Sequence, residues 1–167
     1  MKKQVFSLLV NNNTGLLSRV AGLFSRRGYN IDSITSGTTM NKSLTRITVV
    51  ATGDVQILSQ IEKQLAKLED VVDIKILKDG ESVCRELIML KVKADAAQRA
   101  EIVAVADIFR AKIVDVETES LMLEMTGNLS KVEAFLNLMS GYEILELART
   151  GITGLSRGAD GVFDTEA

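Results

Sequence analysis

The sequence contains no histidine, no proline and no tryptophan, and each absence narrows what the chain can do. Histidine is the commonest general acid–base side chain and the commonest metal ligand, so catalysis and metal binding both lose their usual residue. Without proline there is no rigid proline-rich linker, and glycine and charge must mark any domain boundary instead. We therefore expect no catalytic residue and no metal site.

The sequence also contains only one cysteine and no excess of basic over acidic residues. The single cysteine, Cys84, excludes an internal disulfide framework and suits the reducing cytoplasm, where we expect the protein to reside. The 20 basic and 22 acidic residues give a net charge of −2, whereas nucleic-acid-binding proteins usually have a basic surplus. No apolar run approaches a membrane span, and the segment after Lys2 and Lys3 does not have the form of a signal peptide. The sequence predicts no nucleic-acid and no membrane partner.

Hydrophobic residues, at 46% of 167, suffice for one ordinary domain or two small ones. Apolar periodicity in the first half switches between two and about 3.6, as expected for strands and helices. A helix is predicted to begin at the N-cap Thr14, to carry an apolar stripe, and to end at Gly28. That stripe comprises Leu16, Leu17, Val20, Leu23 and Phe24. The other predicted elements are strands at 5–10, 31–39, 44–52 and 71–77, and a second helix opened by Gly53 and Asp54.

The second half repeats this order. It predicts strands at 84–93, 112–117, 121–126 and 142–149. It also predicts two helices, the first with the apolar residues Ile102, Val105, Ala106 and Phe109, and the second with Leu129, Val132, Leu136 and Met139. The fold class is therefore α+β, with two tandem ferredoxin-like βαββαβ domains. Both helices of such a unit lie on one face of the sheet, so we expect the other face to be bare and to need a partner.

A polar break and a glycine-rich end suggest the domain boundaries. We predict a first domain at 1–78, a linker at 79–83, a second domain at 84–150 and a glycine-rich tail at 151–167 that ends in an acidic stub.

Amide side chains, a glycine and a helix start coincide at Asn11 to Gly15. The first N–H groups of a helix lack intrahelical partners and carry partial positive charge, so this corner can hold a small carboxylate. Asparagine suits a zwitterion, because one amide both donates and accepts hydrogen bonds. Glycine and asparagine are also ordinary turn residues, so a plain turn is the alternative.

The segment from Asn12 to Ile34 reads N-x-T-G-x-L-S-R-V-x-G-L-F-S-R-R-G-Y-N-I-x-S-I. It closely resembles the start of the regulatory small subunit of acetolactate synthase, whose N-terminal domain is an ACT domain, a small-molecule sensing module. The resemblance continues at 44–46, 61–68, 85–87, 108–116, 148–151 and 154–158, and so covers nearly the whole chain.

The resemblance implies a non-catalytic subunit that activates the thiamine-diphosphate-dependent catalytic large subunit in branched-chain amino acid biosynthesis. It also implies feedback inhibition by L-valine or a related branched-chain amino acid as allosteric effector, with no cofactor in this chain. In the family the effector lies at the interface of an ACT homodimer, between the loop after the first strand and the partner's second strand.

The resemblance also indicates the effector-binding residues. Asn12, Gly15 and Asn30 match the family positions tied to effector sensitivity. Their neighbours Thr14, Leu16 and Ile31 complete the predicted set. This chain departs from some family members at the adjacent positions Val10, Asn11 and Asn13, where acidic residues occur.

Three other functions fit the sequence less well. An RNA-recognition module stacks bases on aromatic side chains, and the strand at 44–52 contains none. A small enzyme needs convergent ionisable residues, and no loop offers such a pair. An ACT-type amino-acid sensor that regulates another metabolic enzyme is the closer alternative.

Other residues have plainer interpretations. Leu16 and Leu17 are expected in the core, and Cys84 in a strand without redox function. The acidic residues Glu69, Asp70 and Asp73 are read as a solvated helix end rather than a metal site. The tail segment 151–158 is either a linker or a contact with the catalytic subunit.

Overall fold

A computed structural model of the protein describes residues 1–159 and 161. The acidic stub expected at the end of the sequence lies outside these residues. The chain forms two compact units: the first joins Met1–Val83 to the segment from Ile152 onward, and the second is Cys84–Gly151.

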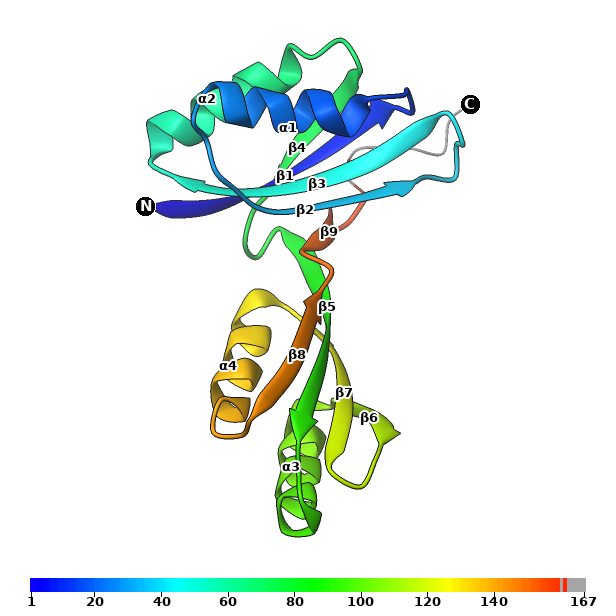
Figure 1. Cartoon of the computed structure of the whole chain (residues 1–167). Helices are drawn as coiled ribbons and strands as arrows, with labels where there is room; N and C mark the ends of the chain where they lie inside the picture. Colours follow the sequence, from blue (N-terminus) through cyan, green and yellow to red (C-terminus); the bar gives the residue numbers. More distant parts are fainter. Residues whose placement is uncertain (160, 162–167) are drawn as a thin grey trace. The chain divides into compact units, whose positions relative to one another are not determined.

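The first unit is an antiparallel sheet with two helices on one of its faces (Figure 1). Its strand order is β2-β3-β1-β4. The elements are β1 (Lys2–Asn11), α1 (Leu16–Arg26), β2 (Ile31–Thr38), β3 (Leu44–Gly53), α2 (Val55–Ala66), β4 (Val71–Leu77) and β9 (Thr153–Ser156). This arrangement confirms the predicted ferredoxin-like fold.

The core of the first unit lies between the helices and the sheet. Phe6, Leu8 and Val10 alternate along β1 and pack in one cluster with Val20 and Phe24 of α1. This alternation follows from the period of two of a strand, as the sequence predicts. Leu16 is buried as expected, but the prediction for Leu17 was wrong, because its side chain is 49% exposed.

The two ends of α1 differ in how well the sequence predicts them. Thr14 is not the N-cap; Gly15 takes that position in a left-handed conformation (φ 81°) and makes no side-chain cap. The C-terminal prediction is confirmed, because Gly28 has φ 69° just beyond the helix. There Gly28 N donates to Ser25 O (3.2 Å) and Tyr29 N to Phe24 O (2.9 Å), the Schellman pattern of helix termination.

The face of this sheet that carries no helix is not bare at its centre, so that expectation was wrong for the first unit. Ser7 and Leu9 of β1 and Thr48 of β3 are buried, although they alternate with the residues that face the helices. The returning segment lies on this face (Figure 1), where Ile152 is buried and its carbonyl oxygen accepts a bond from Thr35 Oγ1 (3.5 Å). The chain thus covers much of this face itself.

The second unit repeats the fold with strand order β6-β7-β5-β8. Its core joins Ile88, Leu90 and Val92 of β5 to Ile102 of α3 and Phe135 of α4. The elements are β5 (Ser82–Lys93), α3 (Ala96–Phe109), β6 (Lys112–Val116), β7 (Ser120–Gly127), α4 (Leu129–Met139) and β8 (Ile144–Arg149). None of the helices in the described part of the chain is long and apolar enough to cross a membrane.

Candidate functional site

The loop from Asn12 to Gly15 joins β1 to α1 at an exposed corner of the first unit. Two backbone hydrogen bonds fix its start. Asn11 N donates to Asp70 O, just before β4, and Asn12 N donates to Ser43 O, just before β3, each at 2.8 Å. The loop therefore begins from a defined position, and its residues are exposed, with Asn12 Nδ2 donating to Lys42 O (3.4 Å).

The helix that follows this loop begins without a side-chain cap. The other three helices of the described chain are capped by Asp54, Asp95 and Asn128, each of which accepts a bond from a backbone N–H of the first turn. An uncapped helix N-terminus retains unpaired donors and partial positive charge. Leu16 N donates to Asn13 O (3.3 Å), so the other N–H groups of the first turn are the ones that can bind a carboxylate from outside the chain.

Gly15 is required here by its backbone conformation rather than by lack of space. A Cβ at this position would lie 3.5 Å from Arg19 Nη1, an ordinary contact, but at φ +81° an L side chain is strained. The glycine thus permits the turn into α1 without backbone strain.

Asp70 joins this corner from the segment between α2 and β4. Its carboxylate accepts bonds from Asn13 Nδ2 (2.7 Å), from Arg19 Nε (2.8 Å) and from Arg19 Nη2. Arg19 Nη1 also donates to Thr14 O (3.4 Å). The Asp70 side chain is only 14% exposed, so its interpretation as part of a solvated acidic cluster was wrong.

The same contacts act on the protonation of Asp70. The hydrogen bond from Asn13, then that from Arg19, lowers the pKa of the Asp70 carboxyl below its usual value. Its hydrogen bonds are therefore retained at all pH values above its ordinary pKa and are lost only as the pH falls further. No local sequence signal marks Asp70, because its partners lie 57 and 51 residues away.

The structure separates the predicted effector residues into two groups. Asn12, Thr14 and Gly15 lie together at the start of α1, with Leu16 buried beneath them. Asn30 and Ile31 lie beyond the far end of α1, at the start of β2. Asn11 pairs with Leu44 and Ile31 pairs with Ala51, so the groups are separated by about 23 Å, seven residues of β3 at roughly 3.3 Å each.

The second unit has a corner built on the same backbone pattern. Lys93 N donates to Glu143 O and Ala94 N to Glu119 O, each at 2.9 Å, just before the last and the third strand of that unit. Here Asp95 and Gln98 form a capping box at the start of α3. The adjoining cavity of about 200 Å³ is lined by these two residues, Ala94, Lys93, Glu119 and Glu143, a mainly acidic set that would repel a carboxylate.

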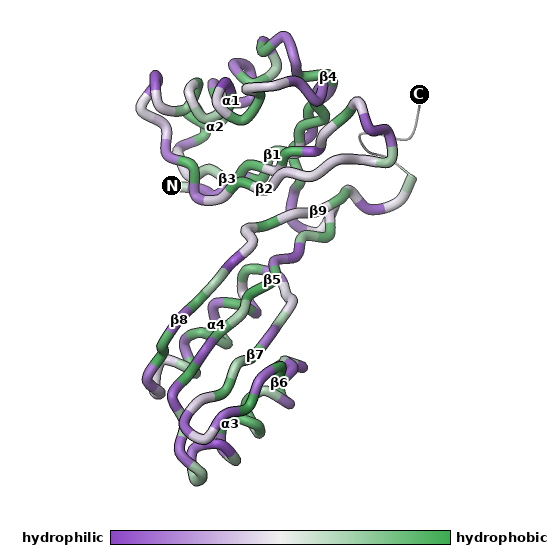
Figure 2. The backbone as a smooth tube through the Cα atoms, turned by 45° about the vertical axis from the view of Figure 1, so that its right-hand side comes forward, coloured by the Kyte–Doolittle hydropathy of each residue, from purple (hydrophilic) through white to green (hydrophobic). Residues whose placement is uncertain are grey.

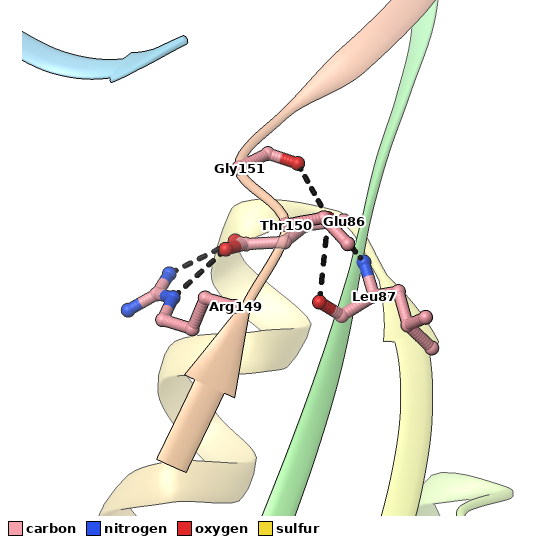
Figure 3. Close-up of polar contacts among 5 residues, drawn as sticks. All are labelled: Glu86, Leu87, Arg149, Thr150 and Gly151. Atoms are coloured by element: carbon pink, nitrogen blue, oxygen red, sulfur yellow. Dashed lines mark hydrogen bonds and ion pairs between the residues drawn. The ribbon is translucent and has the colours of Figure 1, made fainter. Parts of the chain in front are cut away.

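A second polar cluster fixes the ends of β5 and β8 to each other (Figure 3). Arg149 Nε and Nη2 donate to the two carboxylate oxygens of Glu86 at 2.8 and 2.9 Å. Beside them Leu87 N donates to Thr150 Oγ1, and Thr150 N donates to Leu87 O, each at 3.1 Å. Glu86 raises the pKa of the Arg149 guanidinium further above its ordinary value. This cluster fixes the ends of two neighbouring strands of the second unit.

Comparison with known families covers both units. A family model described as the small subunit of acetolactate synthase matches residues 85–158. A second, described as an AHAS small subunit-like ACT domain, matches residues 6–73 and so includes the loop, α1 and Asn30.

Similar proteins and structures agree with these matches. A probable acetolactate synthase small subunit from Methanothermobacter thermautotrophicus is 47% identical over 93% of this chain and 93% of its own length. The acetolactate synthase small subunit of Mycolicibacterium smegmatis is 46% identical over 93% and 92%. The crystal structure of the acetolactate synthase small subunit from Thermotoga maritima superposes with a TM-score of 0.86 at 40% identity, covering 96% of this chain and all of that one (100%).

Proposed function

The chain belongs to the family of acetolactate synthase small subunits, and on this basis we propose that it activates a catalytic large subunit and makes it sensitive to feedback inhibition. The reaction belongs to that partner, a thiamine-diphosphate-dependent enzyme of branched-chain amino acid biosynthesis. This chain supplies regulation and no catalytic residue. We place both subunits in the cytoplasm, which suits a chain with a single cysteine.

The observation that supports an amino-acid effector is the open start of α1. Its N–H groups can bind the carboxylate of valine or a related branched-chain amino acid. The amide of Asn12, exposed in the same loop, can pair with either charged group of a zwitterion.

An effector that contacts both groups of predicted residues needs a second copy of the chain, because about 23 Å separates the groups within one copy. The edge strand β2 can bring the two groups together by pairing with β2 of a second copy. Thr38 pairs with Thr45 at the end of the sheet that holds the corner, and Ile31 lies at the other end. Antiparallel pairing of β2 with its copy would place the partner's Ile31 beside Thr38, at the corner end. We therefore propose a homodimer with the effector between its subunits.

The size of the effector sets the expected affinity. Valine has few atoms, so a dissociation constant in the micromolar to millimolar range is expected, about −8 to −4 kcal/mol. Inhibition then requires that valine bind the two regulatory states with different affinity, and a coupling of roughly 1–3 kcal/mol is usual.

Reconstitution with the catalytic large subunit tests this proposal. We expect acetolactate formation to rise when this chain is added and to fall again with valine, leucine or isoleucine. Gly15→Asp and Asn30→His should each abolish the inhibition and retain the activation, because one adds a carboxylate at the helix start and the other removes the amide.

Gly80→Asp is the matched control, since Gly80 has φ +80° in open space at the β4–β5 turn and meets the same backbone strain as Gly15. It should remain inhibited. Undiminished inhibition of both test variants would refute the site. A response only to some other amino acid would favour a sensor for a different metabolic enzyme.

A further inference from the structure

The side chain of Asp70 connects three separate segments at the corner of the first unit. Asn13 belongs to the β1–α1 loop, Arg19 to the second turn of α1, and Asp70 to the segment that leads into β4. One carboxylate oxygen accepts from Asn13 and the other from Arg19. A single ionised group therefore ties the loop to the helix that follows it.

The second unit shows what this corner is like without such a group. Glu143, whose carbonyl oxygen occupies the place of the Asp70 carbonyl, directs its carboxylate to Lys93 Nζ (3.6 Å), and both side chains are exposed. The start of α3 is fixed by its own capping box, in which Gln98 N donates to the Asp95 side chain and Asp95 N donates to the Gln98 side chain. The two units therefore fix the start of their first helix in different ways, and only the first unit leaves that helix start without a side-chain cap.

We propose that Asp70 is a positioning residue for the effector, acting through Arg19 and Asn13. This inference rests on the proposed function. Asp70 orders the loop through side-chain hydrogen bonds and leaves the N–H groups of the helix start unoccupied. A capping residue would instead block the N–H groups that receive the effector's carboxylate. The negative charge of Asp70 would itself repel that carboxylate, and the adjacent Arg19 guanidinium neutralises it.

Asp70→Asn in the complex with the catalytic large subunit tests the inference. Asparagine keeps the size of the side chain and loses the charge that orders Arg19. We expect the valine concentration for half-maximal inhibition to rise about tenfold, the loss of one charge-assisted hydrogen bond, while activation is retained. Glu69→Gln is the matched control: it removes an exposed carboxylate from the adjacent position and should stay within about twofold of wild type.

A double-mutant cycle separates positioning from direct contact with the effector. If Asp70 acts through Arg19, then Arg19→Gln, Asp70→Asn and the double variant should show similar losses of sensitivity. If Asp70 and Arg19 each act on the effector independently, the two losses should multiply. Multiplying losses, or a sensitivity of Asp70→Asn equal to that of Glu69→Gln, would overturn the inference.

Hydrogen exchange of the chain without effector provides a test independent of inhibition. Asp70→Asn should accelerate exchange of the backbone amides of residues 12–16, and Glu69→Gln should not. Unchanged exchange would overturn the role of Asp70 in ordering the loop. A wild-type complex that ignores every branched-chain amino acid would overturn the proposed function instead, and the exchange result would still decide the role of Asp70.

Discussion

Two ion pairs on neighbouring strands of the second unit differ in the burial of their carboxylates. Glu86 is 3% exposed and receives two bonds from Arg149, whereas Glu146 is 73% exposed and receives one from Lys91 Nζ at 2.9 Å. A buried carboxylate that loses its cation destabilises the folded state, because its charge stays desolvated, whereas an exposed carboxylate becomes hydrated. Individual ion pairs of this sheet should therefore contribute very differently to stability.

We predict that Arg149→Met lowers the free energy of unfolding by about 2 kcal/mol, less than for a fully buried pair because the arginine is partly solvated. Lys91→Met, the matched control, should cost less than about 0.5 kcal/mol. Adding Glu86→Gln to Arg149→Met should recover part of the loss, because the unpaired charge is removed. Urea unfolding gives the free energy of unfolding of the wild type, the two single variants and the double variant. Equal losses in the two single variants would contradict the prediction.

At the scale of elements, β2 is an edge strand whose protection is confined to its start, where the charged Asp32 and a register irregularity between Ile31 and Ser33 lie. It contains neither lysine nor proline, and its second half, Thr35–Thr38, is pale in the hydropathy colouring of Figure 2. Exposed edges that lack charge are templates for pairing with another chain. This supports β2 as the place where two copies associate.

We predict that Ile34→Lys shifts the protein from dimer to monomer in sedimentation equilibrium, because it places a charge on the exposed edge of β2. Val114→Lys is the matched control on β6, the corresponding edge strand of the second unit, where the side chain is likewise exposed. It should leave the dimer intact. A dimer that persists in Ile34→Lys, or a wild-type protein that sediments as a monomer, would contradict a site shared between two copies.

At the scale of the whole chain, the first unit is completed only by residues that follow the second. Ile152 is buried on the sheet face that carries no helix, and the strand β9 continues from it. A leucine three residues further on, Leu155, is 60% exposed. The segment thus contributes one anchoring side chain to the first unit, and its role is at least partly structural.

We predict that Ile152→Ala lowers the free energy of unfolding by about 2 kcal/mol, as expected when a buried isoleucine is truncated. Leu155→Ala in the same segment should change it by less than about 0.5 kcal/mol, since its side chain is largely hydrated already. Chemical denaturation provides both values. Equal effects of the two substitutions would show that Ile152 is not an anchor.

Although it did not reveal the strand β9, the sequence by itself determined the order of elements within each ferredoxin-like repeat and the end of α1 at Gly28. Such features depend on interactions within one turn or along one strand, so periodicity and capping patterns reveal them. The family resemblance was equally readable, because its motifs are short and ordered along the chain.

Only the tertiary structure decided which distant residues meet. It brought Asp70 to Asn13 and Arg19 and returned Ile152 to the first sheet. It also made Gly15 the N-cap in place of Thr14 and left Leu17 in solvent. These outcomes depend on strand register and on how each helix packs against the sheet, and no local pattern of residues carries that information.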